Sequence, residues 1–243
     1  MRRLHIAPVT TAGARARHHR RMHLHDAIAS RRSVRAFLPD PVPADTIRRV
    51  LERAARAPSG GNLQPWHVDV LAGEALAALK ARMQALLAAG TSETPAYAVY
   101  PPDLPSPWRE RRFQIGEQMY ARLGIPREDK AARRRWFARN FAFFDAPMAL
   151  FCSVDRIMGP PQWADLGMYL QTVMLLLRAE GLDSCAQECW AMYPETVGEA
   201  IALPPGRMLF TGMSIGVADT AHPVDGLASE RAPLEETVRF HGL

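Results

Sequence analysis

The chain has 243 residues, of which 48% are hydrophobic and 23% are charged, and its formal net charge at pH 7 is +5. This composition supports a sizeable core in one large domain or two small ones, and it excludes a disordered, collagen-like or disulfide-built chain. Residues 1–21 contain six arginines and no acidic residue, so residues 22–243 together carry a net charge of −1. The excess positive charge therefore belongs to the N-terminal tail, and this argues against a nucleic-acid-binding domain.

Residues 1–21 are predicted to be a disordered basic tail, because they offer little apolar surface to offset the entropy lost on ordering. They lack the unbroken apolar stretch of about 7–15 residues that a secretory signal needs. An arginine-rich start without acidic residues also resembles a transit peptide, but the tail contains no serine. The favoured interpretation is that Met22 is the natural start or that the tail is dispensable. Residues 22–243 are expected to form a single domain.

Apolar periodicity and turn signals predict the elements of this domain. In chain order they are a short helix at 24–31, a proline-punctuated loop, a helix at 44–57, a strand at 66–70, a helix at 74–88, a loop at 95–107, helices at 108–123 and 127–141, a strand at 148–154, helices at 163–180 and 194–203, a strand at 208–217 and a short element at 234–240. The mixed order favours an α+β or α/β sandwich with one core.

The helix at 163–180 is apolar nearly all round, so we expect either its own core or a second subunit to cover it. Asp165 and Arg178 bracket only twelve uncharged residues in it. A membrane span needs about 17–25, so no membrane partner is expected. The three cysteines form no C-x-x-C motif, and no histidine lies near Cys185 and Cys189 to complete a zinc site. We expect no disulfide, no metal and a reducing, cytoplasmic compartment.

The segment Arg31-Arg32-Ser33-Val34-Arg35 places three arginines and a hydroxyl within five residues. The planar guanidinium group of arginine matches the oxygens of a phosphate monoester. The segment is therefore a candidate phosphate site. Taken alone, the segment is a weak signal, because runs of arginine usually lie on the solvated surface.

A second segment runs from Ala57 through Pro58-Ser59-Gly60-Gly61-Asn62-Leu63-Gln64 to Pro65 and Trp66. Its glycines let backbone approach a flat ligand closely, and the amides of Asn62 and Gln64 can bind the edge of a heteroaromatic ring. The alternative is a turn followed by a strand whose tryptophan packs in the core. A third segment, near the C-terminus, contains Arg231, which is unremarkable by itself.

Together, the motifs R-R-S-x-R and A-P-S-x-x-N-x-Q-P-W resemble the nitroreductase family. The sequence Gly181–Gln187 after a long apolar helix, the strand at 212–217 and the late arginine also match, so the resemblance extends over residues 22–243. It implies an α+β, three-layer sandwich with a central mixed β-sheet. It also implies an intertwined homodimer with two FMN sites at the subunit interface.

The FMN ligands implied by the resemblance form four groups. They are Arg31, Arg32, Ser33 and Arg35 at the phosphate and the ribityl or pyrimidine end; Pro58, Ser59, Asn62 and Gln64 from the partner subunit; Ala186, Gln187 and Glu188 near the flavin N5; and Arg231 at the phosphate. Many family members have a Glu-Gly or similar pair where Gln187-Glu188 stands here.

The reaction implied is ping-pong hydride transfer. NAD(P)H reduces the flavin as a co-substrate, and a small aromatic acceptor, nitroaromatic or quinone, then takes the electrons. No protein residue is expected to be catalytic, because the cofactor carries the chemistry. The alternatives are another flavin reaction on the same fold, such as reductive dehalogenation, flavin breakdown or dehydrogenation, and a low-turnover FMN-binding or storage protein.

The segment 108–139 contains ten basic and four acidic residues. One hypothesis is that this charge attracts the phosphates of NADPH or an anionic acceptor, with Arg133, Arg134 and Arg135 as the steering residues. The alternative is a pair of amphipathic helices whose arginines are solvated and whose aromatic side chains pack inward.

Overall fold

The computed structural model describes residues 22–242. The predicted disorder of residues 1–21 therefore lies outside the described residues. Four strands form one sheet in the order β1-β2-β4-β3, and every neighbouring pair is antiparallel. The strands are β1 (His67–Ala72), β2 (Met148–Asp155), β3 (Asp183–Gln187) and β4 (Arg207–Gly216). The only parallel pairing described is an isolated bridge between Ser33 and Ser184.

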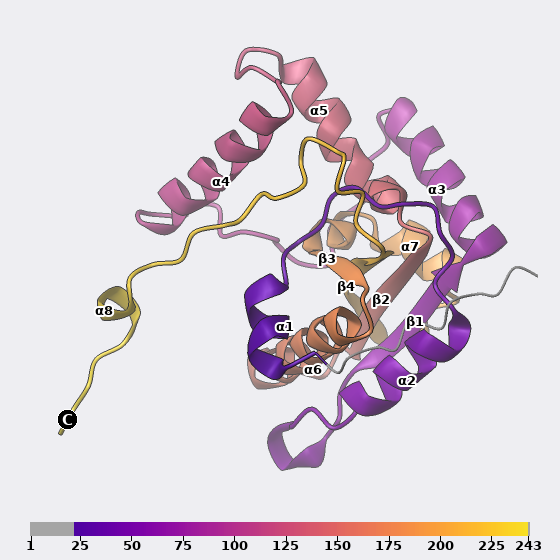
Figure 1. Ribbon diagram of the computed structural model, residues 1–243. Coiled ribbons are helices and arrows are strands. Elements are labelled where there is room, and N and C mark those ends of the chain that lie inside the picture. The colour runs from indigo at the N-terminus through magenta and orange to yellow at the C-terminus, as the bar shows by residue number, and fades with distance from the viewer. Residues whose placement is uncertain (1–21, 243) are drawn as a thin grey trace, which may run out of the picture.

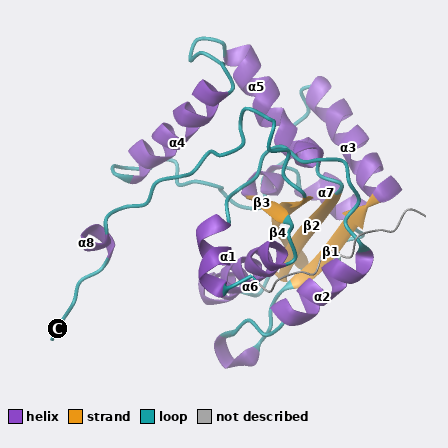
Figure 2. Cartoon of the chain, viewed as in Figure 1, coloured by secondary structure: helices purple, strands orange, loops and turns teal. Residues whose placement is uncertain are grey.

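Helices cover both faces of this sheet (Figure 1). They are α1 (Leu24–Ser30), α2 (Ala44–Ala54), α3 (Gly73–Ala88), α4 (Trp108–Arg122), α5 (Lys130–Ala138), α6 (Pro160–Ala179), α7 (Pro194–Ala200) and α8 (Leu234–Thr237), with 3-10 turns η1 (Gly60–Asn62), η2 (Arg139–Asp145) and η3 (Glu188–Met192). This arrangement confirms the predicted α+β sandwich (Figure 2).

The period-2 geometry of β2 explains the three layers. Leu150 and Cys152 face one core, which α2 and α6 cover, whereas Ala149 and Phe151 face the other core, with α3, η2 and η3. Successive side chains of a strand point to opposite faces, so a central strand covered on both sides must be apolar throughout. All residues of β2 except the last are buried.

Several element boundaries differ from the sequence prediction, and α7 also ends three residues earlier than predicted, at Ala200. The helix predicted to end at residue 57 ends at Ala54, and the helix predicted over 127–141 is α5, followed by η2. Asp129 begins α5 because its side chain accepts a hydrogen bond from the Ala132 N–H at 2.8 Å. The α6 helix begins earlier than predicted, since Pro160 is tolerated in a first turn that needs no N–H donor.

The sequence predicts that the apolar helix α6 is covered on all sides by its own core or by a second subunit. A single chain covers only part of the surface of α6. Leu166, Val173 and Leu177 are fully buried, whereas Met168 on the other side is 41% exposed. No residue of α4 is buried. The C-terminal segment with α8 leads away from the sheet (Figure 1). Among residues 22–242, no helix combines the length and apolar character that crossing a membrane requires.

Candidate functional site

The segment Arg31–Arg35 runs along the free edge of β3. The Val34 N–H donates to the Ser184 carbonyl at 3.1 Å, and Ser33 forms the parallel bridge with Ser184. Val34 and Ala36 are buried, so the alternation of an extended chain leaves Ser33 and Arg35 on the open side. In the pattern Arg-Ser-Val-Arg-Ala, the buried apolar residues thus fix the segment against β3, and the polar residues face the open side.

The three arginines of this segment have different partners. Arg32 forms an ion pair with Asp225 of the C-terminal segment. Within residues 22–242, no carboxylate lies within 4.0 Å of the charged nitrogens of Arg31 or Arg35. Arg35 instead donates to the Ser33 carbonyl at 3.2 Å. Two guanidinium groups and one hydroxyl are therefore available at this edge, and this donor set fits the phosphate dianion of FMN.

The buried thiol of Cys185 lies within the electrostatic influence of these groups. Burial raises the pKa of Cys185, and the positive charges of Arg35 and Arg31 oppose that rise. The Ser33 side chain also opposes it, whereas the negative charge of Glu188 raises the pKa further. Arg31, Ser33, Arg35 and Glu188 thus all lie near enough to Cys185 to influence its charge.

The end of β3 also presents main-chain groups to this edge. The Ser184 carbonyl points away from β4 toward Val34, and the direction of backbone groups alternates along a strand. The N–H and carbonyl of Ala186 therefore point to the same open side. No main-chain group of residues 22–242 pairs with them. An unpaired edge N–H is a donor for a planar ligand lying against the strand.

The side chain of Gln187 is turned into the core and is not free to contact a ligand. Its amide oxygen accepts from the Ser214 hydroxyl at 2.6 Å, and its amide nitrogen donates to the Asn140 carbonyl at 2.8 Å. The residue is 2% exposed. Gln187 therefore links β3, β4 and η2, and it supports the strand end where Ala186 and Glu188 lie.

The loop with Pro58, Ser59, Asn62 and Gln64 adopts a compact, exposed conformation before β1. Asn62 and Gln64 have φ angles of 57° and 50°, in the left-handed region that asparagine tolerates best among residues with a side chain. The Ser59 hydroxyl accepts from the Gln64 N–H at 2.9 Å. The Gly60 N–H donates to both carboxylate oxygens of Asp165 at 3.3 Å, and this contact ties the loop to α6.

The sheet order separates this loop from Arg31–Arg35. The loop leads into β1 at one edge, whereas Arg31–Arg35 follow β3 at the other edge. Three interstrand spacings of about 4.8 Å put the two edges roughly 14 Å apart. One chain thus brings Arg31–Arg35 together with Ala186–Glu188, but it does not bring residues 58–64 to them.

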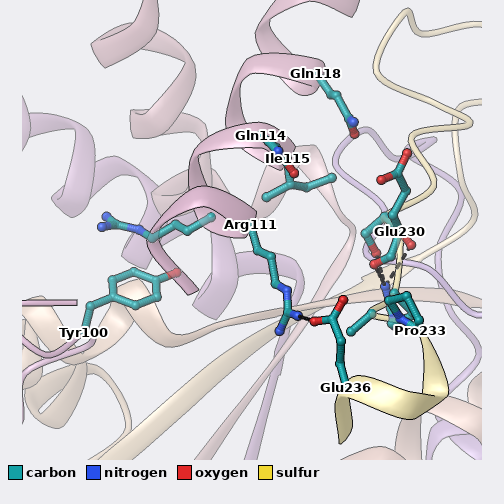
Figure 3. A pocket seen from close by; sticks show the side chains of 12 residues that line it. Tyr100, Arg111, Gln114, Ile115, Gln118, Glu230, Pro233 and Glu236 are labelled. Atoms are coloured by element: carbon teal, nitrogen blue, oxygen red, sulfur yellow. Dashed lines mark hydrogen bonds and ion pairs between the residues drawn. The ribbon is translucent and has the colours of Figure 1, made fainter. Parts of the chain in front are cut away.

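Arg231 lies along α4 instead of beside Arg35. Its Nη1 donates to the Ser229 carbonyl at 2.8 Å and to the Ser229 hydroxyl at 2.6 Å. It lines a cavity of about 470 Å³ between α4 and residues 229–236 (Figure 3). The structure therefore places Arg231 in a different pocket from Arg31 and Arg35.

Sequence reasoning missed three residues of this region, Asp225, Asn140 and Ser214. Asp225 is 193 positions from its partner Arg32, and Asn140 is 47 positions from Gln187. No local motif marks such pairs, because only the folded sheet brings them together. Within residues 22–242, no cluster of three His, Cys, Asp or Glu side chains is placed to hold a metal ion.

Comparisons with known proteins identify the family of this chain. The nitroreductase family model matches residues 28–217. The nitrobenzene nitroreductase of Ectopseudomonas oleovorans is 36% identical over 219 residues, covering 88% of this chain and 95% of that protein. The 4-nitrobenzoate reductase of Nocardioides sp. strain LMS-CY is 38% identical, covering 88% of this chain and 89% of that protein.

Solved structures agree with these relatives. The FMN- and NADPH-dependent nitroreductase NfnB from Sphigopyxis sp. strain HMH superposes with a TM-score of 0.88 and 47% identity, covering 91% of this chain and 100% of that one. The FMN-dependent NfnB from Mycobacterium smegmatis in complex with NADPH has a TM-score of 0.85 and 34% identity, covering 89% and 97%. The predicted resemblance is confirmed, and this chain belongs to the nitroreductase family.

Proposed function

We propose that this chain is an FMN-dependent oxidoreductase that transfers electrons from NAD(P)H to nitroaromatic acceptors. The observation that carries the proposal is the pair Arg31 and Arg35, which have no carboxylate partner among the described residues and lie beside the open edge of β3. Buried or clustered cations without counterions are costly unless an anion binds there. The named activities of the relatives support the same conclusion.

The chain's own residues bind and orient the cofactor in this proposal. Arg31, Ser33 and Arg35 hold the phosphate, and the edge N–H of Ala186 donates to the ring system. When bound, FMN accepts a hydride from NAD(P)H and supplies the electrons that reduce the acceptor. The protein contributes position and electrostatics, while Gln187 keeps the end of β3 in place from inside the core.

A second copy of the chain completes the site in the proposed homodimer. Pro58, Ser59, Asn62 and Gln64 lie at the opposite sheet edge of their own chain, so they reach the flavin bound at the β3 edge only from a partner. The exposed side of α6, where Met168 is 41% exposed, provides apolar surface that such a partner covers. A protein with three free cysteines is also consistent with the cytoplasmic location that the sequence predicts.

Purified protein tests the proposal directly. The protein is loaded with FMN, and NADH and NADPH oxidation is followed anaerobically with nitrobenzene, 4-nitrobenzoate and a quinone. We expect a yellow protein whose NAD(P)H oxidation rises when a nitroarene is added. A protein that binds FMN but does not turn over would instead indicate storage, and a protein that cannot be loaded with FMN would contradict the proposal.

A further inference from the structure

The cavity between α4 and residues 229–236 has no role in the site described above. Its walls come from Tyr100, from one face of α4 and from the segment that contains Arg231 (Figure 3). Its volume of about 470 Å³ is that of a small-ligand site. We propose that this cavity binds the 2′-phosphoadenosine end of NADPH and gives the enzyme its preference for NADPH over NADH. This inference rests on the proposed function.

The charges of the cavity favour a phosphate monoester. Arg111, Arg112 and Arg231 line it together with Glu230 and Glu236. Arg111 is paired with Glu236 at 2.5 Å, so one carboxylate is already neutralised. Arg231 uses Nη1 for oxygen atoms of Ser229 and Glu230, and this holds its guanidinium group in a fixed orientation. Three cations against two carboxylates leave a net positive site for a group that carries a charge of about −2.

Arg112 is the residue best placed to bind the phosphate. Its guanidinium carbon lies 4.0 Å from the centroid of the Tyr100 ring, and no carboxylate of residues 22–242 pairs with it. Stacking on an aromatic ring orients the planar fork of arginine while leaving its edge donors open. The exposed amide of Gln114 and the hydroxyl of Ser229 add neutral hydrogen-bonding groups for a ribose or an adenine.

The position of the cavity suits the far end of a dinucleotide. Asp225 contacts Arg32 of the flavin-site segment, and Ser229 follows only four residues later. Four extended residues span at most about 14 Å, so the cavity begins within that distance of Asp225. The 2′-phosphate of NADPH is separated from the nicotinamide by two riboses and a diphosphate. A nicotinamide at the β3 edge therefore leaves the adenosine end to bind at a separate, cationic surface.

The experiment compares Arg112→Gln with Arg109→Gln in FMN-loaded protein. Arg109 lies on the same helix but pairs with Glu110 outside the cavity, so it is the matched control for helix charge. Binding of 2′,5′-ADP and of 5′-AMP is measured by calorimetry, and KM is measured for NADPH and NADH. For Arg112→Gln we expect 2′,5′-ADP affinity to fall and KM for NADPH to rise, each about tenfold. We expect the NADH constants and the FMN Kd to be unchanged, and Arg109→Gln to behave as the wild type.

Three results would overturn this inference. Wild-type protein that binds 2′,5′-ADP no better than 5′-AMP would show that the cavity does not recognise the 2′-phosphate. A rise in the FMN Kd of Arg112→Gln would assign the cavity to the flavin phosphate. A rise in KM for 4-nitrobenzoate but not for NADPH would assign it to the acceptor. In each case the FMN-loaded wild type still reduces nitroarenes, so the proposed function survives. A wild type without any turnover would contradict the proposed function instead. The 2′,5′-ADP titration would still test the cavity in that case.

Discussion

Arginine is concentrated in two regions of this protein, and the structure uses it differently in each. In the region of α4, α5 and η2, carboxylates of the same chain pair with four of the ten cations at 108–139, as in the ion pairs of Arg133 with Glu117 at 2.5 Å and of Arg139 with Asp145 at 2.8 Å. At the β3 edge, Arg31 and Arg35 have no such partner among residues 22–242. The density of arginine in the sequence therefore does not locate the site, whereas the absence of a counterion beside an open strand edge does.

Steering of anions by Arg133, Arg134 and Arg135 stays a prediction, and the contacts of Arg133 bear on its own share in it. Arg133 donates to both oxygens of Glu117, at 2.5 and 3.0 Å, and its guanidinium carbon lies 4.2 Å from the Tyr120 ring centroid. Arg133 thus holds α4 against α5. The stacked Arg112, by contrast, has no carboxylate partner among residues 22–242 and stays open to a ligand.

The largest effect is expected from Arg35→Gln, which removes a cation from the β3 edge. Loss of one charge-assisted hydrogen bond to a phosphate weakens binding by about 10- to 100-fold. Flavin fluorescence titration measures this as a rise in the FMN Kd. Arg134→Gln, an exposed arginine of α5, is the control and should leave the Kd unchanged. Equal effects of the two substitutions would abolish the distinction between the two regions.

The second-largest effect is expected from Gln187→Leu, which removes the buried amide that supports the end of β3. Gln187→Leu leaves the Ser214 hydroxyl and the Asn140 carbonyl without their partner in a buried position. We expect the free energy of unfolding to fall by about 2–3 kcal/mol. Urea denaturation of the FMN-free protein measures it. Gln84→Leu on the exposed side of α3 is the control, and a loss no larger than that of the control would show that the network does not stabilise β3.

A smaller effect is expected at Arg32, which belongs to the β3 edge by sequence but is paired with Asp225. If Arg32 holds the C-terminal segment and not the phosphate, Arg32→Ala and Asp225→Ala should weaken FMN binding equally, by about threefold or less. The double variant should then be no worse than either single one. Additive losses, or an Arg32→Ala effect as large as that of Arg35→Gln, would place Arg32 among the phosphate ligands.

The smallest effect is expected at the Arg133–Glu117 pair. The hydrogen bond from Arg133 lowers the pKa of Glu117. A carboxyl whose pKa is lowered in the folded state stabilises the fold at pH values above its pKa in the unfolded state. This contribution is lost as the pH falls through the folded pKa. Glu117→Gln should therefore lower Tm at pH 7 by about 2 °C or less, and this difference should shrink toward about pH 3. A difference that grows in acid would contradict the sign.

Much of the fold followed from the sequence because apolar spacing is a local signal. The helices α3, α4 and α6 and the strands β1, β2 and β4 lie close to their predicted positions. The exception is β3. Its sequence Asp-Ser-Cys-Ala-Gln has no β-branched residue and little apolar character, and it forms a strand because β4 pairs with one side of it and Val34 with the other.

The candidate site was predictable in its residue types but not in its connections. The motifs located Arg31–Arg35, the loop at 58–64 and the end of β3. They did not show that Arg32 has a counterion or that the side chain of Gln187 faces the core. These outcomes depend on Asp225 and Asn140, which only tertiary structure brings near.

A mixed dimer gives the most direct test, because each shared flavin site combines the β3 edge of one copy with the loop of the other. Arg35→Gln and the loop variant Ser59→Ala/Asn62→Gly are co-expressed with different tags, and the mixed dimer is isolated through both. We predict that each variant homodimer binds little FMN, while the mixed dimer regains one intact site and binds one FMN per dimer. A mixed dimer that binds as little FMN as its parents would show that both groups act within a single chain, and it would contradict the shared site.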